Sequence, residues 1–292
     1  MPDYMVGCGQ ITWGRDTPED RVLTEIAQAG YEGAPAGPSG SRTPDDTLRF
    51  YTERGLRPAP GYFSARFWDA GLRDQIVEDA DRHADFTAEL GLTELYIAAD
   101  GFDGYTATDG QTRRQTAGRV RSEHALTDDE FQVFGETLNA VAHATLQHGV
   151  RSCFHNHVGT VIETGDEIAR LLSLTDSDVV FLGPDTGHLA WAGADPVEFC
   201  RRYAHRIKTL HLKDVQQSVV ETGRRLEWDY GMCSSQGVWT ELGEGDIDFP
   251  GVFEALGPEF IGWLIVETDV TQLPSALESA QISRTYLRGL EI

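Results

Sequence analysis

Four segments in the second half of the chain carry imidazole, carboxylate or ammonium groups directly after a short apolar run. They are Phe154-His155-Asn156-His157, Asp185-Thr186-Gly187-His188, His211-Leu212-Lys213-Asp214 and Val266-Glu267-Thr268-Asp269. If the apolar runs are neighbouring parallel strands, their ends meet at one rim and the four segments lie together. Two histidines and two carboxylates form a normal ligand set for a divalent metal such as Mn²⁺, Co²⁺ or Zn²⁺, here from His155, Asp185, His211 and Glu267.

Each of these residues also has an ordinary structural interpretation. A single histidine at a strand end packs and hydrogen-bonds more often than it binds a metal. Asp185 can cap the turn that follows it, Glu267 can pair with an arginine, and Lys213 can pair with Asp214 or another surface acid. The metal hypothesis depends on the whole set, because residues at the ends of successive strands are not independent of one another.

The elements that must position these residues alternate between short apolar runs and longer amphipathic ones, which is the pattern of parallel β/α units. Strands are predicted at 5–12, 31–36, 58–63, 94–99, 151–157, 179–183, 207–212 and 262–267. Helices are predicted at 17–30, from 43 onward, and at 75–90, 126–148, 164–172, 196–205, 253–256 and 275–287. Eight such units in 292 residues predict an α/β fold, a (β/α)₈ TIM barrel forming a single domain over 1–292. A doubly wound sheet is the alternative, but no G-x-G-x-x-G fingerprint opens the first helix.

Local sequence patterns add helix caps, loops and side-chain directions to the predicted barrel. Helix N-caps are predicted at three threonines, Thr17, Thr43 and Thr164. Residues 100–125 and 215–245 lack periodicity, and we expect a long loop at the active face and a polar, irregular excursion, respectively. In the fifth strand, alternation places His155 and His157 on one side and Asn156 on the other, so at least one histidine can face the site.

The charge of the chain bears on its partners, and its cysteine content bears on its cellular compartment. The net charge is −23 at pH 7, which disfavours nucleic acid and anionic membranes as partners. The same acidity suits either a solvated surface or a high-salt habitat. We expect a cytoplasmic protein on three grounds. The four cysteines are scattered, no apolar stretch is long enough to span a bilayer, and the segment MPDYMVGCGQ does not look like a signal peptide. We expect a small-molecule partner, and homo-oligomer formation stays open.

Three segments resemble a known family. They are His155-Asn156-His157-Val158-Gly159-Thr160, Asp185-Thr186-Gly187-His188-Leu189 with Ala192 to Pro196, and Arg206-Ile207-Lys208 leading to His211-Leu212-Lys213-Asp214-Val215. All are similar to the xylose isomerase-like sugar isomerase/epimerase superfamily. Among its branches, they look closest to the inosose dehydratases of inositol catabolism, as does the stretch from Gly237 to Phe249. The resemblance covers most of the chain and is most specific from Phe154 to Phe249.

The resemblance implies roles for single residues. Asp185, His211 and Glu267 would be metal ligands, and His155 stands where most of the superfamily has a glutamate ligand. The other two histidines, His157 and His188, would face the substrate or support the ligands, and Lys213 would be a cation beside the substrate oxyanion. In the second strand, Pro35 stands where many relatives have a glutamate, so the exact substrate stays open.

The chemistry that such a site supports is proton removal next to a ketone, with the enediolate charge stabilised by a divalent metal. Loss of a β-hydroxyl then gives dehydration, whereas return of the proton gives isomerisation or epimerisation. The sequence favours a metal-dependent lyase that dehydrates a cyclic polyol ketone, with a sugar or ketose isomerase or epimerase as the alternative. We expect Lys213, His188, His157 and Glu267 to carry the reaction. Cleavage of DNA at abasic sites conflicts with the acidic charge, and a non-catalytic sugar-binding barrel would need no metal.

Overall fold

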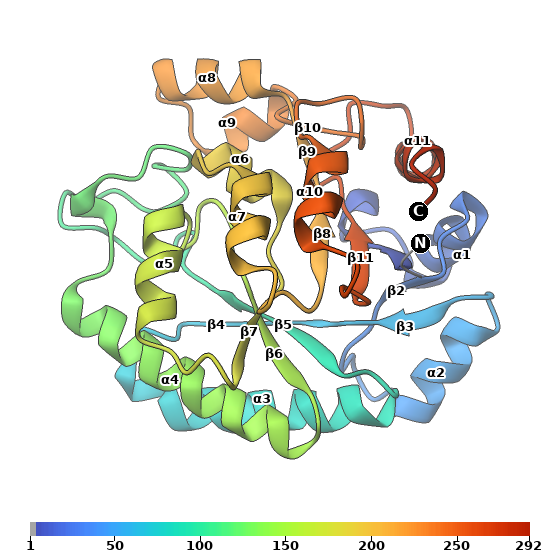
Figure 1. The fold of residues 1–292 in the computed structure, drawn as a ribbon, viewed down its shortest axis with the longest axis horizontal. Coiled ribbons are helices and arrows are strands. Elements are labelled where there is room, and N and C mark those ends of the chain that lie inside the picture. Colours follow the sequence, from blue (N-terminus) through green and yellow to red (C-terminus); the bar gives the residue numbers. More distant parts are fainter. Residues whose placement is uncertain (1–3) are drawn as a thin grey trace.

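Parallel strands surrounded by helices form the body of the protein, in a computed structural model that describes residues 4–292 (Figure 1). The barrel strands are β1 (Met5–Cys8), β2 (Gly33–Pro35), β3 (Arg57–Ala59), β4 (Tyr62–Ala65), β5 (Glu94–Ala99), β6 (Arg151–His155), β7 (Val180–Leu182), β8 (Leu210–Leu212) and β11 (Trp263–Val266). The α-helices are α1 (Glu19–Ala29), α2 (Pro44–Thr52), α3 (Arg73–Glu89), α4 (Asp128–Gln147), α5 (Gly165–Ser173), α6 (Thr186–Ala192), α7 (Pro196–Tyr203), α8 (Gln217–Arg225), α9 (Tyr230–Ser235), α10 (Phe249–Leu256) and α11 (Ala276–Gly289).

The strands follow one another around a barrel. Hydrogen bonds join them in the orders β3-β2-β1-β11-β8 and β4-β5-β6-β7, and parallel bridges from Leu182 to Ile207 and from Asp185 to His211 connect β7 to β8. The third barrel strand is interrupted between β3 and β4, at Pro60 and Gly61, where a proline cannot donate a ladder hydrogen bond. The eight predicted strands are therefore present, the third in two pieces. The single domain over 1–292 stays a prediction.

Two of the three predicted helix N-caps are confirmed. Thr43 accepts a hydrogen bond from the amide of Asp46, and Thr164 forms a capping box with Glu167. The predicted cap at Thr17 is wrong: α1 starts after Pro18 without a side-chain cap, and the Thr17 hydroxyl donates to the Trp13 carbonyl at 2.6 Å.

The excursion predicted as irregular over 215–245 is instead largely ordered. It contains α8, α9 and an antiparallel hairpin of β9 (Asp214–Val215) and β10 (Trp239–Thr240). In Figure 1, α8 and α9 lie together beyond one end of the barrel, near α6. A small apolar cluster joins these elements to the barrel through Val158, Trp191, Val220, Cys233 and Trp239. Long-range packing therefore specifies this segment, although its local sequence is polar.

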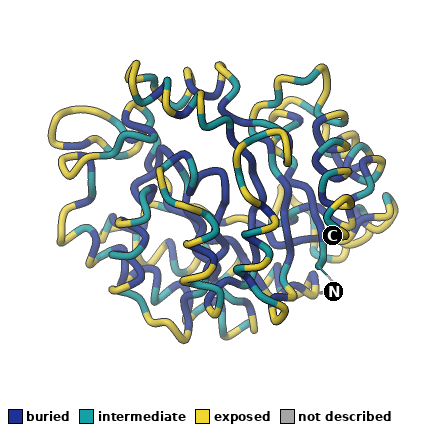
Figure 2. Tube along the Cα trace, turned by 45° about the horizontal axis from the view of Figure 1, so that its top comes forward, coloured by how far each residue is buried: buried dark blue, intermediate teal, exposed yellow. Residues whose placement is uncertain are grey.

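Buried and exposed residues alternate along the trace in Figure 2, and most of the buried ones are apolar. The main core contains buried residues from Val6 to Leu287. Within residues 4–292, no helix combines the length and apolarity needed to cross a membrane.

Candidate active site

The predicted site residues gather at the carboxyl ends of β6, β7, β8 and β11, the rim at which TIM barrels carry their active sites. Most of them line a cavity of about 250 Å³, whereas Asp185 and His188 lie behind its wall. One part of its wall is apolar or aromatic, with Ile11, Pro35, Pro60, Tyr62 and Tyr96; the other part is polar, with His155, His157, His211, Lys213, Glu267 and Asp269. A cavity of this size suits a small molecule.

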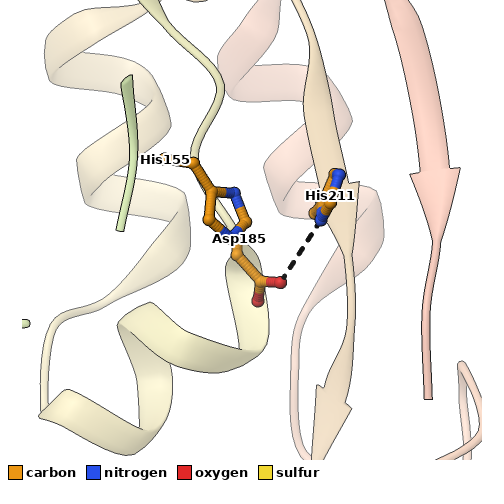
Figure 3. Close-up of side chains that lie close together, drawn as sticks. All are labelled: His155, Asp185 and His211. Atoms are coloured by element: carbon orange, nitrogen blue, oxygen red, sulfur yellow. Dashed lines mark ion pairs between the residues drawn. The ribbon is translucent and has the colours of Figure 1, made fainter. Parts of the chain in front are cut away.

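Three of the four predicted metal ligands form a compact buried group. One ligand atom from each of His155, Asp185 and His211 lies within 4.8 Å of the others (Figure 3). Asp185 uses Oδ1 to accept the His188 amide hydrogen at 2.9 Å, so it does cap α6, as the structural interpretation predicted. Its Oδ2 stays available to the site.

Several polar atoms of this group lack hydrogen-bond partners. Among the residues described, Asp185 Oδ2 and both ring nitrogens of His211 are buried and make no hydrogen bond of normal geometry, although Lys213 Nζ lies 3.3 Å from Asp185 Oδ2. His211 Nδ1 lies 3.9 Å from Asp185 Oδ2, the contact dashed in Figure 3, and 3.3 Å from Glu267 Oε2. Unsatisfied buried polar atoms are costly. A cation bound between them would remove that cost, so the donor set fits a divalent metal.

His155 is oriented by its second nitrogen. Its Nδ1 lies 3.1 Å from the carbonyl oxygen of Gly183, and because a carbonyl only accepts, Nδ1 carries the hydrogen. Nε2 of the neutral ring then keeps its lone pair, which is the form of histidine that binds a metal.

Glu267 lies beside this group. Its Oε2 is 3.3 Å from both His211 Nδ1 and Lys213 Nζ, and its side chain is 14% exposed. Gly9 makes room for it, since a Cβ at Gly9 would lie 2.3 Å from Glu267 Oε1. The alternative pairing of Glu267 with an arginine is not what the structure shows: its ion-pair partners in the described chain are His211 and Lys213.

A second polar group adjoins the first. His157, His188 and Asp269 offer ligand-type atoms within 4.8 Å of one another, and the rings of His157 and His188 lie 3.6 Å apart. His157 Nδ1 donates to the Val158 carbonyl at 2.7 Å, which leaves its Nε2 unprotonated in the neutral ring. His188 Nδ1 accepts the amide hydrogen of Val158 at 3.2 Å.

Lys213 lies between the two groups and is 1% exposed. Its Nζ is 2.6 Å from Asp269 Oδ1 and 3.3 Å from carboxylate oxygens of both Asp185 and Glu267. The alternative pairing of Lys213 with Asp214 is wrong. Asp214 turns the other way and accepts backbone amide hydrogens from Gly243 and Gly245 of the excursion and from Ile247 just after it.

Burial dominates the pKa values of the imidazoles. It lowers the pKa of His155 and His188 well below the ordinary value, and nearby imidazoles and Lys213 lower it further. Burial, followed by Lys213, lowers the pKa of His157 to about 4. All three rings are therefore neutral around neutral pH, the form in which a histidine binds a metal or accepts a proton.

The charged groups of the site shift one another's pKa values. Burial lowers the pKa of Lys213, but Asp185, Asp269 and Glu267 outweigh burial and raise it well above the ordinary value. Burial raises the pKa of Glu267, but His211 and Lys213 outweigh it, and the pKa falls below the ordinary value. Glu267 is thus a carboxylate and Lys213 an ammonium.

Two residues of the site were given no role from the sequence. Asp269 lies two positions after Glu267, and the alternation that grouped His155 with His157 also groups Asp269 with Glu267. Tyr230 donates its hydroxyl hydrogen to Asp269 Oδ2 at 2.9 Å, but it comes from the excursion, where no local pattern indicated it.

Comparison with known proteins defines the class. Residues 23–289 match the xylose isomerase-like TIM barrel family, and the chain belongs to this family. An inosose dehydratase from Geobacillus kaustophilus is 31% identical over 275 residues, which cover 91% of this chain and 87% of the relative. The family resemblance and the barrel predicted from the sequence are therefore confirmed.

Solved structures share the fold. The IolI protein, crystallised with a zinc atom, superposes with a TM-score of 0.68 at 15% identity and covers 99% of this chain and 98% of its own. A 3-keto-D-glucoside 4-epimerase from E. coli has a TM-score of 0.70 at 14% identity and covers 98% of this chain and 99% of its own. These likenesses show the shared fold, whereas the family match and the dehydratase relative identify the chain as an enzyme of the lyase or isomerase/epimerase class.

Proposed function

We propose that the chain is a metal-dependent dehydratase that removes water from an inosose or a closely related cyclic polyol ketone. The observation that carries this proposal is the buried set His155, Asp185 and His211, with ligand atoms that lack hydrogen bonds, beside Lys213 and Glu267 at a small cavity. The inosose dehydratase relative supports dehydration over the other outcomes of the same chemistry.

The four residues predicted as ligands are those that would hold the metal. His155 and His211 would supply nitrogen, and Asp185 and Glu267 would supply oxygen. Mixed nitrogen and oxygen donors suit Mn²⁺, Co²⁺ and Zn²⁺ alike. When bound, the metal would act as a Lewis acid that stabilises negative charge on the substrate oxygen.

The remaining residues would stabilise the substrate oxygen and transfer the protons. The Lys213 ammonium would donate a hydrogen bond to the carbonyl oxygen as an enediolate forms. His157 lines the cavity with an unprotonated Nε2 in its neutral ring, so it is the imidazole best placed to accept the proton from the carbon next to the carbonyl. The protonated imidazole would then donate to the departing β-hydroxyl, which leaves as water.

His188 would support this proton transfer rather than face the substrate. It packs behind His157, with ring centres 3.6 Å apart, and its Nδ1 accepts the amide hydrogen of Val158, which fixes the ring. The apolar wall with Tyr62 and Pro35 would hold the ring carbons of the substrate. A polyol ring presents C–H groups on one face and hydroxyls at its edge, which matches a cavity with one apolar and one polar side.

An isomerase or epimerase is the second candidate, favoured by the epimerase among the structural neighbours. Both reactions start with loss of the same proton, so the product decides between them. The test is incubation of the metal-loaded protein with a panel of inososes and ketoses, followed by NMR. Dehydration gives a product that has lost one water, whereas a rearranged ketose of unchanged mass supports the second candidate and refutes the first.

A further inference from the structure

Three carboxylates surround the Lys213 ammonium, but they are not equivalent. Asp185 and Glu267 lie at 3.3 Å from Nζ and belong to the proposed metal ligands, whereas Asp269 lies at 2.6 Å and does not. A carboxylate that binds a divalent metal has less negative charge to offer a neighbouring cation. With metal bound, Asp269 is therefore the carboxylate that stays dedicated to Lys213.

A residue of the excursion holds the Asp269 carboxylate in place. Its Oδ2 accepts the hydroxyl hydrogen of Tyr230 at 2.9 Å, and this contact joins residues 39 positions apart. Tyr230 lies in α9, and its amide hydrogen is donated to the Arg114 carbonyl at 3.0 Å. The two Asp269 oxygens thus have separate partners, one in the barrel and one in the excursion.

The Tyr230 ring is also held from several sides. It stacks on Trp191 with ring centres 5.1 Å apart, contacts Phe102 edge-on at 5.0 Å, and lies 6.0 Å from the His157 ring. Lys213 Nζ lies 5.0 Å from the ring centre of Trp239, which also comes from the excursion. Aromatic packing of this kind fixes the direction of the phenol hydroxyl.

We propose that Tyr230 and Asp269 are positioning residues that hold the Lys213 ammonium at the substrate oxygen and away from the metal ligands. A lysine has four side-chain torsions, and Lys213 without Asp269 would be drawn toward Asp185 and Glu267, where it competes with the metal. The excursion is then part of the catalytic apparatus. The proposal rests on the proposed function only in assigning Lys213 to the substrate oxygen.

The chain offers an unusually direct probe, because Lys208 and Lys213 are its only lysines. Lysine labelled with ¹³C at the ε carbon should give two NMR signals. Lys208 is partly exposed and donates to the His205 carbonyl, far from the site, so its signal is an internal control. The signals are recorded on the metal-loaded protein without substrate.

In Tyr230→Phe, which keeps the packed ring, the Lys213 signal should shift or broaden while the Lys208 signal stays in place. We expect kcat to fall about 10-fold, and about 100-fold in Asp269→Asn, because hydrogen bonds to charged groups contribute this much. Metal content by elemental analysis should stay at the wild-type value. The matched control is Tyr105→Phe, which loses a hydroxyl bonded to the Ala125 carbonyl outside the site.

Two results would overturn the proposal. An unchanged Lys213 signal in both variants would show that the pair does not position the ammonium. Loss of metal in Asp269→Asn would make Asp269 a metal ligand instead. The signals do not depend on turnover. If the wild-type protein fails to convert any inosose, yet the Lys213 signal of the two variants differs from that of wild type as expected, the proposed function is refuted and the positioning pair stands.

Discussion

Glu163 is a buried carboxylate that shares a single guanidinium with another carboxylate. Arg113, from the 100–125 loop, is fully buried and binds Glu167 through two hydrogen bonds of 2.8 and 3.0 Å. Glu163 lies 3.9 Å from the same guanidinium and accepts amide hydrogens from Gly118 and Gly159, each at 2.7 Å. Arg113 is therefore committed to Glu167, and the charge of Glu163 is only partly compensated.

This imbalance predicts a pH-dependent stability. Burial raises the pKa of Glu163 from 4.5 to about 7, although Arg113 and the two amide groups oppose the rise. Between these values the folded protein holds a proton that the unfolded chain has released. Its contribution to the free energy of unfolding is thus present at low pH and lost as pH rises toward 7. The difference between the pKa values of Glu163 in the unfolded and folded states corresponds to about 3 kcal/mol in the free energy of unfolding.

Glu163→Gln removes this titration. The free energy of unfolding of the variant, relative to wild type, should therefore rise by about 3 kcal/mol between pH 4.5 and pH 8. Urea denaturation of both proteins across this range measures the difference. Glu136→Gln, at an exposed residue paired with Arg73, controls for the chemical change. Parallel curves for wild type and Glu163→Gln would refute the reasoning.

Three further variants test the site. Glu267→Gln should keep the circular dichroism spectrum but lose at least about 100-fold in kcat/KM together with bound metal; normal activity with lowered stability would make Glu267 structural. Gly9→Ala should displace the Glu267 carboxylate and lower kcat/KM about 10-fold, because its Cβ would lie 2.3 Å from Oε1; Gly37→Ala, with open space at its Cβ, is the control. Lys213→Met should slow the exchange of the substrate α-proton with D₂O, and exchange at the wild-type rate would exclude Lys213 from the reaction.

The sequence indicated the barrel and the main site because both follow from local patterns. Alternating apolar and amphipathic runs predicted the strands, and the strand ends that carry His155, Asp185, His211 and Glu267 do meet at one rim. The capping box at Thr164 is equally local, since Thr164 and Glu167 lie within one turn.

What the sequence did not indicate depends on contacts distant along the chain. The helices α8 and α9 are short, and their buried residues Val220 and Cys233 pack against Trp191 of α6. No window of the local sequence contains that partner, so the segment looked like a polar loop. Tyr230 was missed for the same reason, because its link to Asp269 joins the excursion to the loop that follows the last barrel strand.

We propose that this rim site eliminates water from a cyclic polyol ketone with the help of a bound divalent metal. The most direct measurement is an NMR time course with an inosose, comparing chelator-treated protein with the same protein after addition of Mn²⁺, Co²⁺ or Zn²⁺. We predict no reaction after chelation and, with one equivalent of metal per chain, a product lacking one water. Undiminished turnover in the chelator, or a metal-dependent product that retains all its oxygen atoms, would contradict the account.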